Sequence, residues 1–149
     1  MAVMVPFLVI GMMGFLDLGR AFYYQIAITN AVREGARYAA QPYYTGLNPS
    51  CATPPQNPGA NCVTASDAAI QQHVLNELNG TGIGMVASDI TVVPDQTGRV
   101  NNVIGPQPQS QYPIEVRASY NFRFITPIIG SLIGDPLTIK TSSVVRAEY

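Results

Sequence analysis

Few residues in this chain have types and spacing that could do chemistry, and the two cysteines are the clearest of them. Cys51 and Cys62 bracket the segment ATPPQNPGAN, which is too rich in Pro, Gly and Asn for a helix or a strand. Two cysteines around such a loop predict a disulfide formed in an oxidising compartment, and two free cytosolic thiols are the alternative. By restricting the unfolded chain, the bond would stabilise the folded state by about 3 kcal/mol.

A second pair consists of opposite charges. Asp17 and Arg20 are three positions apart in a segment with a helical pattern, so their side chains share one face and can form an ion pair. The single histidine, His73, has no cluster of Cys, Asp or Glu around it in the sequence. We therefore expect His73 on an exposed or edge face and not in a metal site.

Catalytic and nucleic-acid-binding motifs are missing from the sequence. One histidine leaves no conventional Ser-His-Asp or Cys-His system, and no Gly-rich phosphate loop is present. The 9 acidic residues are scattered without a spaced pair for acid–base work. The net charge is −1 and no basic block occurs, which argues against binding to nucleic acid. We expect no enzyme activity, no cofactor, no metal and no nucleic-acid partner.

The element that would position Asp17 and Arg20 is an N-terminal helix over residues 1–40. Its first part, residues 1–16, is apolar without interruption, and the remainder is amphipathic. Residues 1–16 give about 24 Å of helix, against about 30 Å of hydrocarbon in a bilayer. A membrane or filament-core helix is therefore predicted, with contacts from Val3, Val5, Pro6, Phe7, Leu8, Ile10, Met13, Phe15 and Leu16.

Other interpretations of this segment remain open. A soluble core helix is one, and a secretory signal peptide is another, although the basic start and small-residue cleavage site of a signal peptide are missing. Pro6 would either loosen the helix or be tolerated, as prolines are in membrane helices. The arginines that follow the apolar run favour a cytoplasmic C-terminal part, whereas the disulfide favours the opposite orientation. A basic leader removed from upstream of Met1 would resolve that conflict.

The second half of the predicted helix has one stripe of mostly small residues. Positions separated by three and four residues form this stripe, and Gln41-Pro42 ends the helix. A sheet could pack closely against the stripe, which consists of Ala21, Tyr24, Ile28, Ala31, Gly35 and Ala39. The sequence thus predicts two domains, a helix over 1–40 and a globular α+β domain over 41–149.

The globular part shows one further helix and three strands. Residues 65–79 predict a helix with a capping box of Thr64 and Asp67, and with Ala68, Ala69, Val74, Leu75 and Leu78 facing inward. Strands are predicted at 90–93, 112–124 and 137–149, and the middle one alternates as a half-buried antiparallel strand does. Residues 41–63 and 94–111 are predicted to be surface loops. The apolar segment 125–136 predicts a short helical turn, a buried loop or an exposed contact tip.

Several segments carry a family resemblance. They are VPFL at 5–8, GFLDLGRAFY at 14–23 and NAVREGARYAA at 30–40, followed by YPIEV at 112–116, YNF at 120–122, ITP at 125–127 and VVRAEY at 144–149. Together they resemble the TadE-like proteins of tight-adherence (Tad/Flp) pilus systems. The resemblance covers both ends of the chain and leaves the middle unmatched.

The resemblance implies a type IV pilin-like plan, in which a long helix packs on a small antiparallel sheet. A precursor would enter the inner membrane by its helix, be trimmed by a prepilin peptidase, and pass through a pilus assembly platform into an extracellular filament at the cell surface. Family members usually carry a Glu about six residues before the position of Pro6, which falls upstream of Met1. Without that Glu, Asp17 and Arg20 are expected to set the register in the filament core.

The expected function is therefore that of a structural subunit of a Tad-type filament, with copies of itself as partners. Low charge and 8 tyrosines suit a protein whose surface is covered by neighbours. The alternative is a minor pseudopilin, or a single-span membrane-anchored envelope module, that does not polymerise alone.

Overall fold

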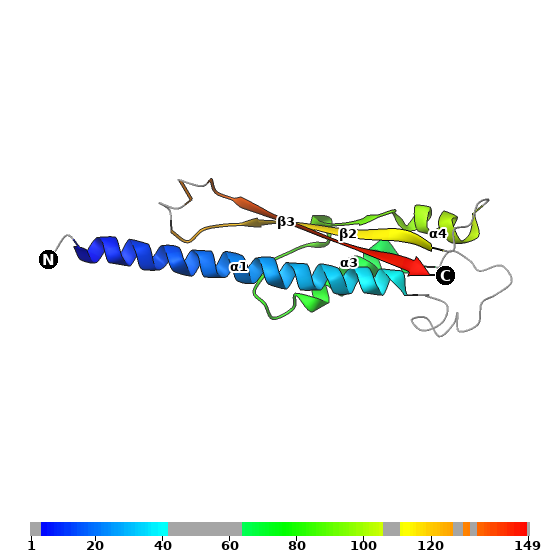
Figure 1. The fold of residues 1–149 in the computed structure, drawn as a ribbon, viewed down its shortest axis with the longest axis horizontal. Helices are drawn as coiled ribbons and strands as arrows, with labels where there is room; N and C mark the ends of the chain where they lie inside the picture. Colours follow the sequence, from blue (N-terminus) through cyan, green and yellow to red (C-terminus); the bar gives the residue numbers. More distant parts are fainter. Residues whose placement is uncertain (1–3, 42–63, 106–110, 127–129, 132–133, 149) are drawn as a thin grey trace.

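One helix, α1 (Met4–Ala40), sets the length of the molecule (Figure 1). The computed structural model describes residues 4–41, 64–105, 111–126, 130–131 and 134–148. A three-stranded sheet and the helix over residues 67–77 lie beside the second half of α1, whereas its first half extends beyond the sheet. The structure confirms the predicted α+β fold, in which a long helix with an apolar first half packs on a small antiparallel sheet.

The second half of α1 packs through the predicted stripe of small residues. Ile28, Ala31, Gly35 and Ala39 are buried, as the helical spacing predicted. The stripe lies close to α3 (Asp67–Glu77), where a Cβ added at Gly35 would clash with Cγ2 of Val74. Gly35 is therefore a packing requirement, since α3 lies where a side chain would be.

Two Gly→Ala substitutions on α1 should distinguish the effect of packing from the effect of helix propensity on stability. Gly35→Ala is expected to lower the free energy of unfolding by about 1–3 kcal/mol, because the stiff side chain of Val74 must move. Gly19→Ala is the matched control on the same helix, since a Cβ there has no neighbour within 4 Å. It should be neutral or stabilising, by up to about 1 kcal/mol. Denaturant unfolding in detergent measures both, and equal effects would contradict the close approach.

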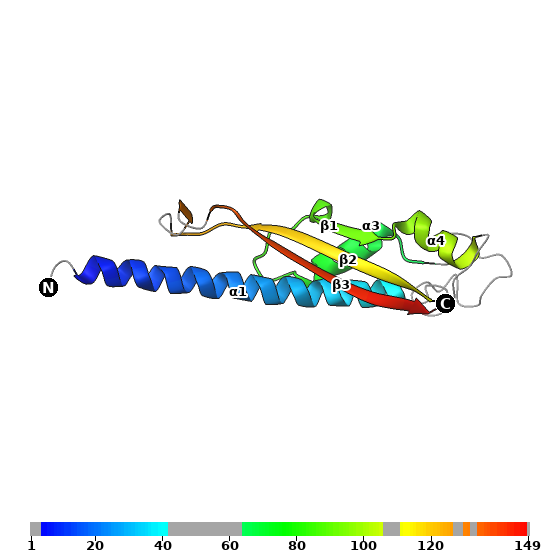
Figure 2. The same ribbon diagram turned by 45° about the horizontal axis from the view of Figure 1, so that its top comes forward.

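The sheet has the order β1 (Ile90–Val93), β2 (Gln111–Phe122) and β3 (Leu137–Glu148), all antiparallel. β2 and β3 pair along their whole length and run beside α1 in both views (Figure 2). Alternate residues of β2 are buried, as predicted: Tyr112, Ile114, Val116, Ala118 and Phe122. The three strands lie where the sequence predicted them, except that β2 runs from Gln111 to Phe122 and not over 112–124.

The predicted N-terminus of α3 was wrong in detail. Ser66 is the N-cap, and its Oγ accepts a hydrogen bond from the Ala69 N–H at 3.1 Å. Thr64 is buried two positions earlier and accepts from Nε of Arg99 at 3.1 Å. Ala68, predicted to face inward, is exposed, and Ile70 is buried in the core. The long-range contact of Thr64 with Arg99 thus displaced the predicted capping box.

The prediction of a loop over 94–111 was wrong for half of this segment, because residues 96–104 form α4 (Gln96–Ile104). Asp95 caps α4 by accepting from the Gly98 N–H at 2.9 Å. The anchor of α4 is Arg99, whose side chain is fully buried. Its guanidinium donates to the Pro94 and Ala65 carbonyls, each at 2.7 Å, and pairs with Asp67 at 2.7 Å. Tertiary contacts, and not helix propensity, therefore hold α4 in place.

Candidate functional site

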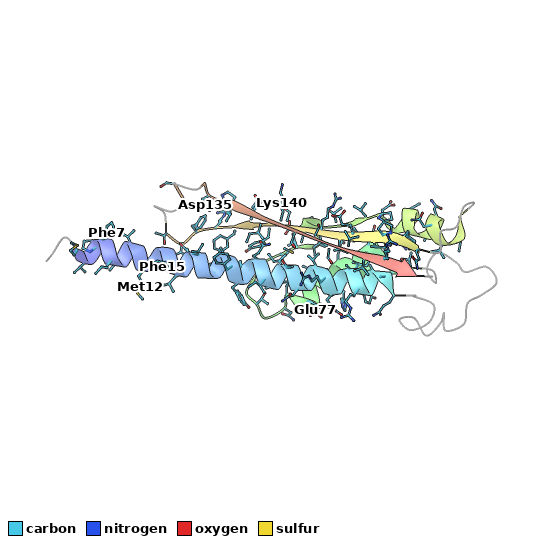
Figure 3. All side chains as sticks on the ribbon, viewed as in Figure 1. Phe7, Met12, Phe15, Glu77, Asp135 and Lys140 are labelled. Atoms are coloured by element: carbon cyan, nitrogen blue, oxygen red, sulfur yellow. The ribbon has the colours of Figure 1, made fainter. Side chains whose placement is uncertain are left out.

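The first half of α1 is an apolar rod, which we call the arm and define as Met4–Leu16. The described side chains from Met4 to Met13 are all exposed, and Phe7 and Phe15 are 76% and 77% exposed. Figure 3 shows Phe7 and Met12 projecting from different sides of the arm. Among the described members of the predicted contact set, every one from Val5 to Leu16 is exposed, whereas Val3 lies outside the described residues.

By length and composition α1 could cross a membrane. A buried core helix or a signal sequence can pass the same test, but only 6% of the most apolar window of α1 is buried within the molecule. The arm is therefore not a core helix of this fold. α1 also continues without a break beyond Pro6, so proline is tolerated at this position.

The arm ends at Asp17, which is 2% exposed although the arm around it is open to solvent. Its carboxylate accepts from the Thr126 N–H at 2.8 Å and from the Ile125 N–H, which lies 3.1 Å from both oxygens. Nη1 of Arg20 also donates to it at 3.2 Å, so the predicted pair is present. Asp17 thus fixes the end of the β2–β3 hairpin to α1, a role that sequence spacing did not show.

Aromatic rings surround this contact. The guanidinium carbon of Arg20 lies 5.3 Å from the ring centroid of Phe122 and 5.7 Å from that of Tyr24. Phe122 meets Tyr24 and Phe124 edge to face, with centroids 5.5 and 5.3 Å apart. Cation–π and edge-to-face contacts of this kind add to the hydrogen bonds of Asp17. We call the segment of α1 from Asp17 to Tyr24 the root, because here the arm joins the domain.

Removal of the carboxylate should loosen the hairpin locally. In Asp17→Ala, the Ile125 and Thr126 amides lose their acceptor. We expect the free energy of local opening at these amides to fall by about 2 kcal/mol, because hydrogen bonds to a charged group are stronger than neutral ones. Hydrogen exchange of residues 124–126 measures the change. Asp17→Asn keeps an acceptor oxygen and should show a smaller effect, and unchanged exchange in Asp17→Ala would contradict the role of Asp17.

The outer face of the sheet is polar and carries a depression of about 480 Å³. Nη2 of Arg117 donates to Oε2 of Glu115 at 2.6 Å, and this bond lowers the pKa of Glu115. Asp89 and Lys140 line the same depression, so its charges are balanced, and its lining includes neither His nor Cys. This arrangement offers ion pairs but no nucleophile activated by a base.

The remaining predicted sites give a mixed result. The ring of His73 is half-buried and stacks on Tyr38 of α1, with centroids 4.5 Å apart. In the described part of the chain, no group of three His, Cys, Asp or Glu could hold a metal ion. Cys51 and Cys62 lie outside the described residues, and their disulfide stays a prediction.

One comparison with known proteins gives a match. Residues 1–37 match the model of a family described as TadE-like protein. The match covers the arm, the root and most of the remaining α1, and it confirms the resemblance over this part of the chain. No curated protein and no solved structure matches the chain. The match and the exposed apolar arm together fit a pilus-associated protein of the membrane or envelope.

Proposed function

Starting from that match, we propose that the chain is a structural subunit of an extracellular Tad-type filament, assembled through its N-terminal helix. Before assembly the arm is held in the inner membrane. The partners are the membrane, copies of the same chain, a prepilin peptidase and a pilus assembly platform. The TadE-like match over residues 1–37 and the apolar first half of α1 support this proposal.

The observation that carries the proposal is the exposure of the arm on all its sides. A helix that is apolar on one face needs one partner, but a helix that is apolar all round needs lipid or several neighbours around it. The arm has ten large apolar side chains that are at least 40% exposed: Met4, Val5, Phe7, Leu8, Val9, Ile10, Met12, Met13, Phe15 and Leu16. A bilayer and a bundle of identical helices both satisfy this requirement.

The energetics favour a surrounded arm. Full burial of a large apolar side chain contributes about 1.5–3 kcal/mol. Association costs about 4–15 kcal/mol in lost freedom, so contact along one side of the arm leaves little net stability. Contacts with several neighbours exceed this cost. When such contacts are repeated without closing on themselves, they produce a fibre.

Electron microscopy of material sheared from the producing cells, with mass spectrometry of the recovered protein, tests the proposal. Filaments composed mainly of this chain are the expected result. Filaments that lack the chain, with the chain retained in the membrane fraction, would contradict it. That second result would favour a minor pseudopilin or an anchored envelope module.

A further inference from the structure

We propose that the end of the β2–β3 hairpin is a second membrane contact, which lies in the bilayer interface when the arm is inserted. The hairpin end is defined here as residues 123–126, which directly follow β2. The proposal rests on the proposed function, because it requires the arm to be held in a bilayer before assembly. This surface contacts the interfacial layer of the lipid bilayer.

The sequence around the root sets its depth in a bilayer. The apolar arm stops at Leu16, and Asp17 is the first charged residue after it. Phe22 and Tyr23 follow, 61% and 51% exposed, and aromatic residues are typical of the membrane interface. An inserted arm therefore places the root, residues 17–24, at the boundary between hydrocarbon and headgroups.

Hydrogen bonds attach the hairpin end to the root. Because the carboxylate of Asp17 lies 2.8 Å from the Thr126 amide and 3.1 Å from the Ile125 amide, the hairpin end shares the depth of Asp17. Both views show the chain at the end of β2 beside the first half of α1, far from the C-terminus (Figures 1 and 2). An inserted arm thus brings the hairpin end to the bilayer surface without any movement.

Part of the surface at this depth is apolar. The charge of Asp17 is turned inward and satisfied, and Arg20 lies over the rings of Tyr24 and Phe122. Two outward side chains are apolar, since Ile125 is 66% and Leu18 is 51% exposed, whereas Arg123 and Asp135 are exposed charges of the same hairpin. This surface continues the apolar surface of the arm. The lipid that covers the arm before assembly therefore also covers the hairpin end.

Two arginines lie in this region. Arg123 is exposed on the hairpin end, and the side chain of Arg20 is 37% exposed. Long cationic side chains beside an apolar surface reach from the interface toward headgroup phosphates. The negative charge of Asp17 offsets one of them, so this contact depends on apolar insertion and does not require an anionic lipid.

Single tryptophan probes test the depth of each segment, because the chain contains no Trp. The variants Phe15→Trp, Ile125→Trp and Val144→Trp are prepared in the full chain. They are reconstituted into phosphatidylcholine vesicles with bromine near the carbonyl end or near the methyl end of the acyl chains. Val144 is the matched control, because it is 58% exposed on β3, away from the root.

We expect the probe at 125 to lose most of its emission to bromine near the carbonyl end, and less to bromine near the methyl end. The probe at 15 should be quenched more strongly at the deeper position, and the probe at 144 at neither. In an Asp17→Ala background, the probe at 125 should regain emission while the probe at 15 stays quenched.

Three results would overturn the inference, and they are distinguishable. If the probe at 15 is quenched and the probe at 125 emits as in water, the hairpin end does not touch lipid and the proposed function stands. If neither is quenched, the membrane-held arm fails as well. If emission at 125 shifts to the blue only as the protein-to-lipid ratio rises, without quenching, a second copy covers the surface.

Discussion

A chain carrying Ile10→Asp is expected to stay out of the membrane and to form no filaments. Ile10 lies in the middle of the arm. An Asp at the centre of a membrane helix costs about 2.5–3.5 kcal/mol, which corresponds to roughly a hundredfold loss of insertion. In a filament core the same carboxylate would be buried without a partner. Fractionation of cells and electron microscopy of sheared material measure the two effects.

The control for this experiment lies on the same helix. Ile26 is 61% exposed, but it lies beyond the root, beside the sheet. Ile26→Asp should leave the chain in the membrane fraction, because residue 26 stays in water when the arm is inserted. Normal insertion of Ile10→Asp, or equal loss in both variants, would show that the arm is not the inserted segment.

Substitution of the buried arginine should give the largest loss of stability in the globular part. Arg99→Met is expected to lower the free energy of unfolding by about 3 kcal/mol, because the Thr64, Ala65 and Pro94 oxygens lose a charged donor. Asp67 also loses its partner, although it is 35% exposed and water replaces part of that contact. Denaturant unfolding in detergent measures the change.

An exposed ion pair supplies the comparison for Arg99. The side chain of Arg117 is 57% exposed and pairs with Glu115 on the outer face of the sheet. Arg117→Met makes the same chemical change and should have little effect, because solvent screens an exposed pair. Similar losses in the two variants would mean that burial does not set the importance of Arg99. If the amides of α4 lose their protection from hydrogen exchange in Arg99→Met but keep it in Arg117→Met, the result supports Arg99 as the anchor of α4.

Local periodicity in the sequence determined most of the fold. The stripe of α1 and the alternation of β2 were predicted because a helix and a strand repeat every 3.6 and every 2 residues. The arm was also evident, since an uninterrupted apolar run depends on no distant residue. The TadE-like match falls on this same helix, so the family resemblance of this part could also be seen in the local sequence.

Only the tertiary structure decided which polar residues hold the parts together. Asp17 meets Thr126 across 109 positions, and Arg99 meets Thr64 across 35. No local repeat relates such pairs, so Asp17 was predicted to pair with Arg20 alone, and α4 was predicted to be a loop. The sequence by itself determined which apolar residues of α1 and β2 are buried, because hydrophobic patterning is local. The fold decided the partners of the buried charges, because a carboxylate or guanidinium out of water needs donors or acceptors that only chain folding brings near.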